Sequence, residues 1–371
     1  MTRRGTRNPR QRRARGRSRV GERFTADVGP VAHGGHCVVR LPEPETRVVF
    51  VRHAIPGERV VLEITEGTEG DRFWRADAVE VLDPAPERVA APCPVAGPGL
   101  CGGCDFQHVD LVHQRELKAE VVREQLSRLA GLDLDVVVEA VPGDVDGLRW
   151  RTRQRYVELP DGRRGMRKHR SHDVVPVDDC LLEASDPASH SVLGHEFSVD
   201  DDGFWQVHPG APQALVETVV DFLGPRAGES VLDLYAGVGL FARFLADAVG
   251  PGARVLAVEG NRRAVEHAAV NLGDRAEVAA GSVDRVLAAA YDEPFDLVVL
   301  DPPREGAKRS VVEQVEARSP RAIAYVACDP AALARDVAIF AEHDYRLDRL
   351  RALDLFPMTS HVECVAHHVK G

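Results

Sequence analysis

The second half of the chain repeats one pattern, in which a short apolar run is followed by a turn and an amphipathic segment. From about residue 204 onward, four such apolar runs occupy residues 231–235, 254–259, 296–301 and 322–328. This alternation is typical of βαβ units, whose strands form a mostly parallel sheet covered by helices on both faces. The sequence therefore predicts a doubly wound α/β domain over residues 201–371.

The first twenty residues differ in charge from the rest of the chain. They carry nine arginines and no acid, whereas the whole chain has a net charge of −11, which leaves −20 for residues 21–371. Because like charges repel, residues 1–20 are predicted to be a disordered basic tail, which either contacts a phosphate backbone or only aids solubility. The tail lacks the apolar segment of a secretory signal, and no run is apolar enough to span a membrane. We therefore expect a cytoplasmic protein with no membrane partner.

Residues 21–83 alternate short β-branched runs with turns that contain Gly and Pro. The runs lie at 38–41, 47–51, 59–64 and 75–82, and this spacing is typical of a small β-barrel. The stretch HAIPGERVVLEI resembles a TRAM domain, a barrel similar to the oligonucleotide-binding fold. The resemblance implies that this barrel binds RNA. Cys37, inside it, is interpreted as a core residue.

A central region, residues 84–200, begins with a cysteine cluster. Cys93, Cys101 and Cys104 lie within CPVAGPGLCGGC, and Cys180 stands alone in DDCLLE. The C-x2-C spacing with two further cysteines is a metal signature, and spacing alone favours structural zinc over an iron–sulfur cluster. A helix is predicted over residues 111–131, and we expect it to pack on the α/β domain.

Positive charge gathers later in the central region. Residues 149–170 carry nine basic and two acidic side chains, which gives +7 in an otherwise acidic body. Arg149, Arg151, Arg153 and Arg155 alternate, which would place all four on one face of a strand. We expect this basic face to be the main RNA surface.

Glycines and acids mark a candidate cofactor site in the α/β half. Gly237 and Gly239 follow an apolar strand, where they let the backbone approach a ligand. Glu259 ends the next strand, at a place where an acid accepts the ribose hydroxyls of an adenosyl group, and Asp301 ends a third strand.

The segments DLYAGVG, VEGN and VLDPPR resemble class I S-adenosylmethionine-dependent methyltransferases, and more closely the RNA 5-methyluridine methyltransferase family. The resemblance implies that Tyr235, Glu259, Asp301 and Gln206 (in FWQVH) bind S-adenosylmethionine. Many members have an asparagine where this chain has His208.

Methylation of uracil at carbon 5 requires a nucleophile and a base. A thiolate that adds to carbon 6 makes carbon 5 nucleophilic, and a base then removes the carbon-5 proton. Cys328 ends an apolar strand before a helix, where its segment VACDPAALARD resembles the nucleophile motif of the family. The usual motif has Asn where this chain has Asp329, whose charge should raise the thiol pKa. HVECV (361–365) resembles the family's His-Val-Glu segment, which implies Glu363 as the base.

The resemblance also bears on the metal. Many family members hold a [4Fe-4S] cluster on four cysteines, which implies Cys93, Cys101, Cys104 and Cys180 as ligands and a small central iron–sulfur domain, with zinc as the alternative. This chain has Cys-x7-Cys where the family has Cys-x5-Cys.

Together these features predict a monomeric enzyme that methylates carbon 5 of a uridine in structured RNA, ribosomal rather than transfer RNA. Two alternatives remain. Asp-Pro-Pro resembles the motif of methyltransferases that act on exocyclic nitrogen, which need no cysteine such as Cys328. The chain would instead be a non-catalytic RNA-binding metalloprotein if it failed to bind S-adenosylmethionine.

Overall fold

The computed structural model describes residues 16–186 and 188–371, so that most of the predicted basic tail, residues 1–15, lies outside the described residues. The chain divides into two compact units. The first comprises the residues up to Ala32, His36–Arg88 and Gly97–Leu100, and the second comprises His33–Gly35, Val89–Ala96 and Cys101–Gly371.

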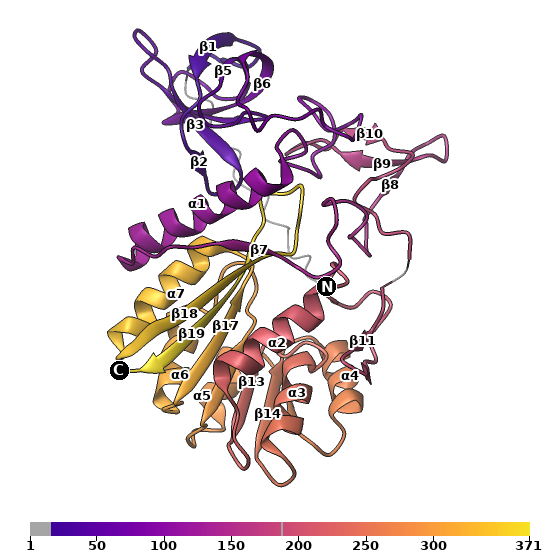
Figure 1. Cartoon of the computed structure of the whole chain (residues 1–371), viewed down its shortest axis with the longest axis vertical. Helices are drawn as coiled ribbons and strands as arrows, with labels where there is room; N and C mark the ends of the chain where they lie inside the picture. The colour runs from indigo at the N-terminus through magenta and orange to yellow at the C-terminus, as the bar shows by residue number, and fades with distance from the viewer. Residues whose placement is uncertain (1–15, 187) are drawn as a thin grey trace, which may run out of the picture. The chain divides into compact units, whose positions relative to one another are not determined.

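The first unit is built on a six-stranded sheet, as the short β-branched runs predict (Figure 1). Its strands are β1 (Arg23–Asp27), β2 (Val31–Ala32), β3 (His36–Arg40), β4 (Val48–Arg52), β5 (Arg59–Glu66) and β6 (Phe73–Asp83), in the order β1-β5-β6-β4-β3-β2. Alternate side chains such as Val49, Val51, Val60 and Leu62 form its core. Cys37 is buried in this core, as predicted, and its thiol donates to the Ala54 carbonyl.

Two of the nine arginines assigned to the tail are folded on this sheet. The Arg19 guanidinium lies 5.0 Å from the centre of the Trp74 ring and forms ion pairs with Glu22 and Glu45 at 2.8 and 2.6 Å. Arg17 pairs with Glu22 at 2.8 Å. Glu22 and Glu45, which pair with these arginines, both lie beyond position 20. Counting charges within residues 1–20 alone could therefore not find these ion pairs.

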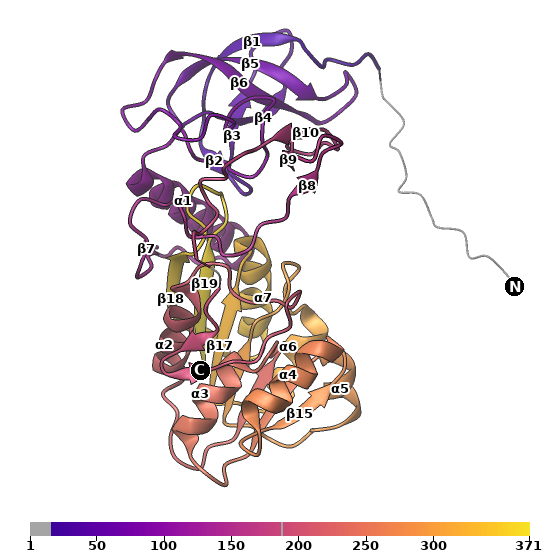
Figure 2. The same ribbon diagram turned by 90° about the vertical axis from the view of Figure 1, so that its right-hand side faces the viewer.

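The second unit contains an eight-stranded sheet with helices on both faces (Figures 1 and 2). Its order is β15-β14-β13-β16-β17-β19-β18-β7. The strands are β13 (Val231–Leu234), β14 (Val255–Glu259), β15 (Glu277–Ala280), β16 (Leu297–Leu300), β17 (Ala322–Ala327), β18 (Tyr345–Asp354), β19 (Glu363–Lys370) and β7 (Val138–Ala140). The strands from β15 to β17 are parallel, whereas β19 is antiparallel to both neighbours.

Two helical layers cover this sheet, which confirms the doubly wound prediction. Helices α2 (Ala211–Leu223), α3 (Leu240–Val249) and α4 (Arg262–Leu272) pack on the face that includes Val231. Helices α1 (Leu111–Ala130), α5 (Val283–Ala289), α6 (Arg309–Ala317) and α7 (Pro330–Glu342) pack on the face that includes Leu232. Neighbouring residues of one strand thus serve two separate cores, as expected for a sheet buried on both faces.

Helix α1 was predicted with nearly its observed bounds. The Asp110 carboxylate accepts from the Val112 and His113 backbone N–H groups, and Gly131 ends the helix with a φ of 67°. The helix packs on α7, and its buried Lys118 pairs with Asp354 of β18 at 2.5 Å. With β7, α1 thus joins the central region to the α/β sheet.

The rest of the central region is built from short strands. They are β8 (Val157–Glu158), β9 (Arg164–Arg167) and β10 (Val174–Pro176) in one sheet, and β11 (Ser191–Val192) and β12 (His195–Glu196) in another. No helix in the described ranges is long and apolar enough to cross a membrane.

The prediction that residues 149–155 form a strand with one basic face is wrong. Residues 149–155 form no strand, because Arg149 has a left-handed φ of 56° and only Arg151 makes an isolated bridge. Arg149 forms two hydrogen bonds with Asp179, at 2.7 and 2.5 Å, and Arg153 donates to the Asp202 and Gly203 carbonyls. The +7 count overstates the free charge, since Asp179, which forms an ion pair with Arg149, lies outside residues 149–170.

Candidate active site

The predicted cofactor residues meet at one edge of the sheet. Leu234 of β13 is in register with Val258 of β14 and Leu300 of β16. Because these parallel strands end together, the residues that follow or close them, Tyr235, Glu259 and Asp301, lie at the same carboxyl edge. Open α/β sheets bind ligands at this edge.

The turn after β13 is shaped by backbone conformations that few residues adopt. Tyr235 has a φ of 62° and Gly239 a φ of 88°, and a Cβ on Gly239 would lie 3.0 Å from the Leu272 side chain. The Glu259 carboxylate accepts from Gly237 N at 2.9 Å and from Asn261 N at 2.6 Å. This carboxylate is thus fixed beside the glycine turn before any ligand binds.

Asp233 supports the structure of this site, and the sequence reasoning missed it. It is buried within β13, and its carboxylate accepts from Ala242 N at 2.9 Å, in the first turn of α3. Burial raises the pKa of Asp233 to about 8. An acid inside an otherwise apolar four-residue strand was the available signal. Its hydrogen bond holds the helix start against the strand.

Gln206 comes from a different element, the loop between β12 and α2, where it is half-buried. Two hydrogen bonds anchor this loop, since Thr152 donates its N–H and its hydroxyl to the Val207 carbonyl at 2.9 and 3.0 Å. His208 is buried, stacks on Trp150 with ring centres 5.8 Å apart, and accepts from Gly210 N at 3.1 Å. His208 therefore shapes the turn before α2.

The structure places Cys328 and Glu363 at the ends of adjacent antiparallel strands. Ala327 of β17 is paired with Cys364 of β19. Cys328 directly follows Ala327 and Glu363 directly precedes Cys364, so that the two residues lie at neighbouring strand ends, where the Glu363 charge acts on the thiol. Cys364 points into the apolar core, as the alternation of a strand predicts.

The surroundings disfavour the charged form of both groups. Burial, followed by the Glu363 and Asp301 carboxyls, raises the pKa of Cys328 to about 12. Burial and the nearby Asp301 also raise the pKa of Glu363 well above its usual range. Asp329, which the sequence marked as a problem for the thiol, has a smaller effect than these. Its carboxylate caps α7 by accepting from Ala332 N at 2.8 Å.

Arg304 is the cation of this site. It lies in the loop after Asp301, and its charge lowers the pKa of both Cys328 and Glu363. Its guanidinium is also 3.4 Å from the His361 ring. The sequence reasoning quoted Arg304 within VLDPPR without assigning it a role. Its position beside a thiol and a carboxyl was the information that the motif alone did not contain.

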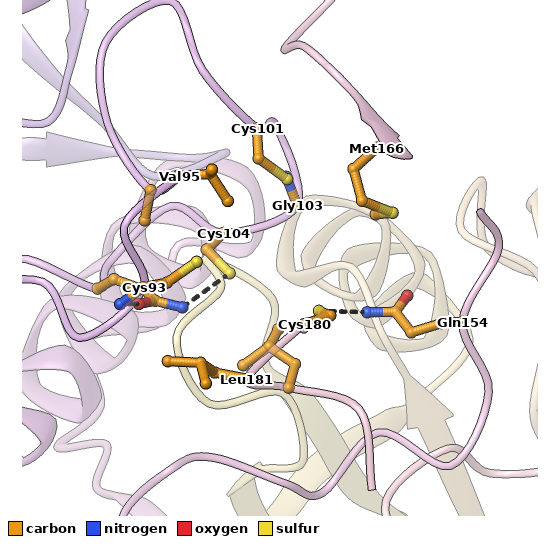
Figure 3. Close-up of a pocket in the computed structure, with 12 residues that line it drawn as sticks. Cys93, Val95, Cys101, Gly103, Cys104, Gln154, Met166, Cys180 and Leu181 are labelled. Carbon is orange, nitrogen blue, oxygen red and sulfur yellow. Dashed lines mark hydrogen bonds between the residues drawn. The ribbon is translucent and has the colours of Figure 1, made fainter. Parts of the chain in front are cut away.

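The four cysteines of the central region line one pocket (Figure 3). Cys93, Cys101 and Cys104 come from residues 93–104, and Cys180 approaches from the segment after β10. Gln107 donates to the Cys104 sulfur at 3.3 Å, and Gln154 donates to the Cys180 sulfur at 3.0 Å. The other lining residues include Val95, Met166 and Leu182 and no carboxylate.

This pocket is not a preformed site for a single ion. Among residues 16–186 and 188–371, no group of three or more His, Cys, Asp or Glu side chains could hold a metal ion as it stands. Burial raises the pKa of Cys104 to about 12, so that the thiol is neutral in this state. The iron–sulfur domain is therefore not shown, and the cluster stays a prediction.

The fold and the edge of the sheet define the class of protein. Parallel strands that end in an antiparallel strand, with a glycine turn and acids at the carboxyl edge, are the features of a class I S-adenosylmethionine-dependent methyltransferase. The structure of the tRNA (uracil-54, C5)-methyltransferase of Pyrococcus abyssi in complex with S-adenosyl-L-homocysteine has the same fold, with a TM-score of 0.67. It is 23% identical and covers 93% of this chain and 100% of its own.

Sequence comparison identifies the family. The tRNA (Uracil-5-)-methyltransferase family matches residues 289–370, which include Cys328 and Glu363. The methyltransferase small domain matches residues 210–324, and the TRAM domain matches residues 17–79. This last match confirms the predicted TRAM-like barrel.

Relatives that match nearly the whole chain support the same family. An uncharacterized RNA methyltransferase of Streptomyces coelicolor is 44% identical over 94% of this chain and 93% of its own length. The 23S rRNA (uracil(1939)-C(5))-methyltransferase RlmD of Chromohalobacter salexigens is 31% identical over 96% and 92%. The chain therefore belongs to the TRAM-containing family of RNA (uracil-5-)-methyltransferases, and it is an S-adenosylmethionine-dependent RNA methyltransferase.

Proposed function

We propose that this enzyme methylates carbon 5 of a uridine in ribosomal RNA through a covalent adduct between Cys328 and carbon 6. The observation that carries the proposal is that Cys328 and Glu363 lie at neighbouring ends of β17 and β19, where the Glu363 and Asp301 charges act on the thiol. A nucleophile and a base at adjacent strand ends can act on neighbouring atoms of one planar ring.

The proposed reaction balances with these two residues. The Cys328 thiol loses its proton to solvent, and the thiolate adds to carbon 6. The electron pair of the carbon 5–carbon 6 double bond then lets carbon 5 take the methyl group as the methyl–sulfur bond of S-adenosylmethionine breaks, which leaves S-adenosyl-L-homocysteine. The carboxylate of Glu363 then takes the carbon-5 proton, carbon 5 and carbon 6 re-form their double bond, and the sulfur leaves with its electron pair. These reaction steps need the charged forms of Cys328 and Glu363, which Arg304 favours.

Tyr235, Glu259, Asp301 and Gln206 are proposed to bind S-adenosylmethionine, which supplies the methyl group on a sulfonium. Glu259 is held beside the glycine turn by the Gly237 and Asn261 N–H groups, and each of its two oxygens keeps a further lone pair for a ligand. Burial and the Glu259 charge raise the pKa of Asp301 to about 7. Because the charged form of Asp301 is disfavoured here, a neighbouring cation would stabilise it.

Ribosomal RNA is the proposed substrate because the relative from Chromohalobacter salexigens, which matches nearly the whole chain, is named for a uridine of 23S rRNA. A deletion strain is expected to lack one 5-methyluridine of its ribosomal RNA, measured by nuclease digestion and mass spectrometry of purified fragments. The intact gene should restore the modification, and the gene with Cys328→Ala should not. Loss of 5-methyluridine from transfer RNA alone would contradict the choice of substrate.

We further propose that Cys93, Cys101, Cys104 and Cys180 hold a [4Fe-4S] cluster. Four thiols in one pocket without carboxylates suit a soft metal site. Zinc bound by four sulfurs about 2.3 Å from one point remains the alternative. Gly102 allows the cysteine-bearing loop to pack closely against the backbone of residue 169, since a Cβ there would lie 2.6 Å from His169 N.

Protein purified without oxygen is expected to be brown and to contain about four irons per chain, because each cluster carries four. Replacing Cys180 with serine should bleach it, whereas Cys37→Ser, in the barrel, should leave the visible spectrum unchanged. Metal analysis and absorption spectra are the measurements. A colourless protein with one zinc per chain would favour the alternative.

A further inference from the structure

The segment that leads into Glu363 is fastened to the loop that carries two of the pocket cysteines. Asp105 and Phe106, which follow Cys104, donate their backbone N–H groups to the Met358 carbonyl at 3.0 and 3.1 Å. In the other direction, Ser360 N donates to the Asp105 carboxylate at 3.0 Å. Asp105 and Phe106, which directly follow Cys104, are thus both hydrogen-bonded to the turn that precedes β19.

Gln114 of α1 reinforces this junction. Its side-chain amide donates to the Phe106 and Val109 carbonyls at 3.1 and 2.9 Å and accepts from Met358 N at 2.9 Å. Gln114 is completely buried. Met358 has a left-handed φ of 63°, a conformation that costs energy and persists only where the surroundings hold it. The segment before Glu363 therefore takes its shape from contacts with residues 105–114.

The same segment reaches the reacting groups. His361 follows Ser360, and its ring lies 3.4 Å from the Arg304 guanidinium. Two residues later, Glu363 begins β19. A displacement of Ser360 would therefore move the base and the contact of His361 with Arg304, but it would leave Cys328, which lies between β17 and α7, in place.

We propose that Asp105 is a positioning residue for Glu363, through which the cysteine-bearing loop sets the geometry of proton removal. This inference rests on the proposed function, because it assigns Asp105 to one step of that reaction. Asp105 touches no reacting atom in this assignment. Its loss should slow the steps that need the base and spare the addition of Cys328 to carbon 6.

The test separates these steps with two RNA substrates in single-turnover reactions. With 5-fluorouridine RNA, carbon 5 has no proton after methylation, so that the adduct forms without any base and remains. With uridine RNA, release of the methylated product requires Glu363. Asp105→Ala should form the fluorinated adduct at the parent rate and release product from uridine RNA about tenfold or more slowly, since small displacements of reacting groups have effects of this size.

Three further variants make the result specific. Asp105→Asn keeps an oxygen acceptor for Ser360 N and should restore most of the release rate. Ser360→Pro removes the N–H of the same hydrogen bond, and the double variant should be no slower than either single one. Asp296→Ala also removes a carboxylate that accepts a backbone N–H, from Ser230 at 2.8 Å before β13, and it should behave as the parent.

Parent-like release by both Asp105→Ala and Ser360→Pro would overturn the proposal. So would a fluorinated adduct that forms as slowly as product is released, because Asp105 would then act on the nucleophile or on RNA binding. The parent protein's own fluorinated adduct tests the proposed function separately, since it depends on Cys328 and not on Asp105.

Discussion

Replacing Cys328 with alanine is expected to abolish methyl transfer while leaving the affinity for S-adenosylmethionine nearly unchanged. The thiol is the proposed nucleophile, and without it carbon 5 of uracil stays too weak a nucleophile to attack the methyl group. Labelled methyl transfer to RNA and calorimetric titration of the cofactor measure the two properties. Activity above a few per cent of the parent would contradict the covalent mechanism.

The control for this variant is Cys37→Ser, a buried cysteine in the first unit, which should keep parental activity.

The parent should also show a pH dependence. Because the pKa of Cys328 is raised to about 12, the thiol is protonated at neutral pH, and the rate of adduct formation should rise with pH as the thiolate fraction rises. A rate that falls with pH between 6 and 9 would indicate a different nucleophile.

Replacing Glu363 with glutamine is expected to trap a methylated covalent adduct between protein and RNA. Addition and methyl transfer do not need the base, whereas proton removal does, and general-base catalysis contributes about 10²–10⁴-fold. Denaturing gels of single-turnover reactions should show the adduct accumulate as product release falls by this factor. Glu342→Gln, an exposed acid at the end of α7, is the matched control. Turnover without adduct would assign the base elsewhere.

The same variant should fold at least as well as the parent. The pKa of the buried Glu363 is raised in the fold, so that the folded state binds more protons than the unfolded state between the unfolded and the folded pKa. Stability contributed by this group is therefore lost as pH rises through that window. Glutamine resembles the neutral acid, so the variant should not lose this stability as pH rises. Thermal unfolding of both proteins at pH 5 and pH 8 measures the difference.

Much of the sheet could be predicted because its strands are buried on both faces. Apolar runs mark β13, β14, β16 and β17 directly, and the acids that follow them lie where parallel strands end. The bounds of α1 followed from Gly131 and the apolar spacing. These features depend on residues close together in the chain, which local patterns describe.

The sequence could not show which distant residues would meet. Alternating arginines resemble one face of a strand, yet Arg149 is drawn away by Asp179, thirty residues later. Asp105 meets Ser360 across 255 positions, and no local pattern links them. Likewise β7 joins the edge of the sheet beside β18, although its three residues were placed in the central region. Such pairings depend on the tertiary fold.

The edges of the large sheet are where a second chain could add a strand. One edge is β15, which has only four residues. The other is β7, which covers Ala352–Asp354 of β18 and leaves the rest of that long strand uncovered by backbone. The uncovered part bears Arg346, Asp348, Arg349 and Arg351, and a bulge interrupts its register after Leu347. Short edges, charges and bulges all hinder edge-to-edge pairing. The strand that supports the base is therefore protected against aggregation by its own side chains.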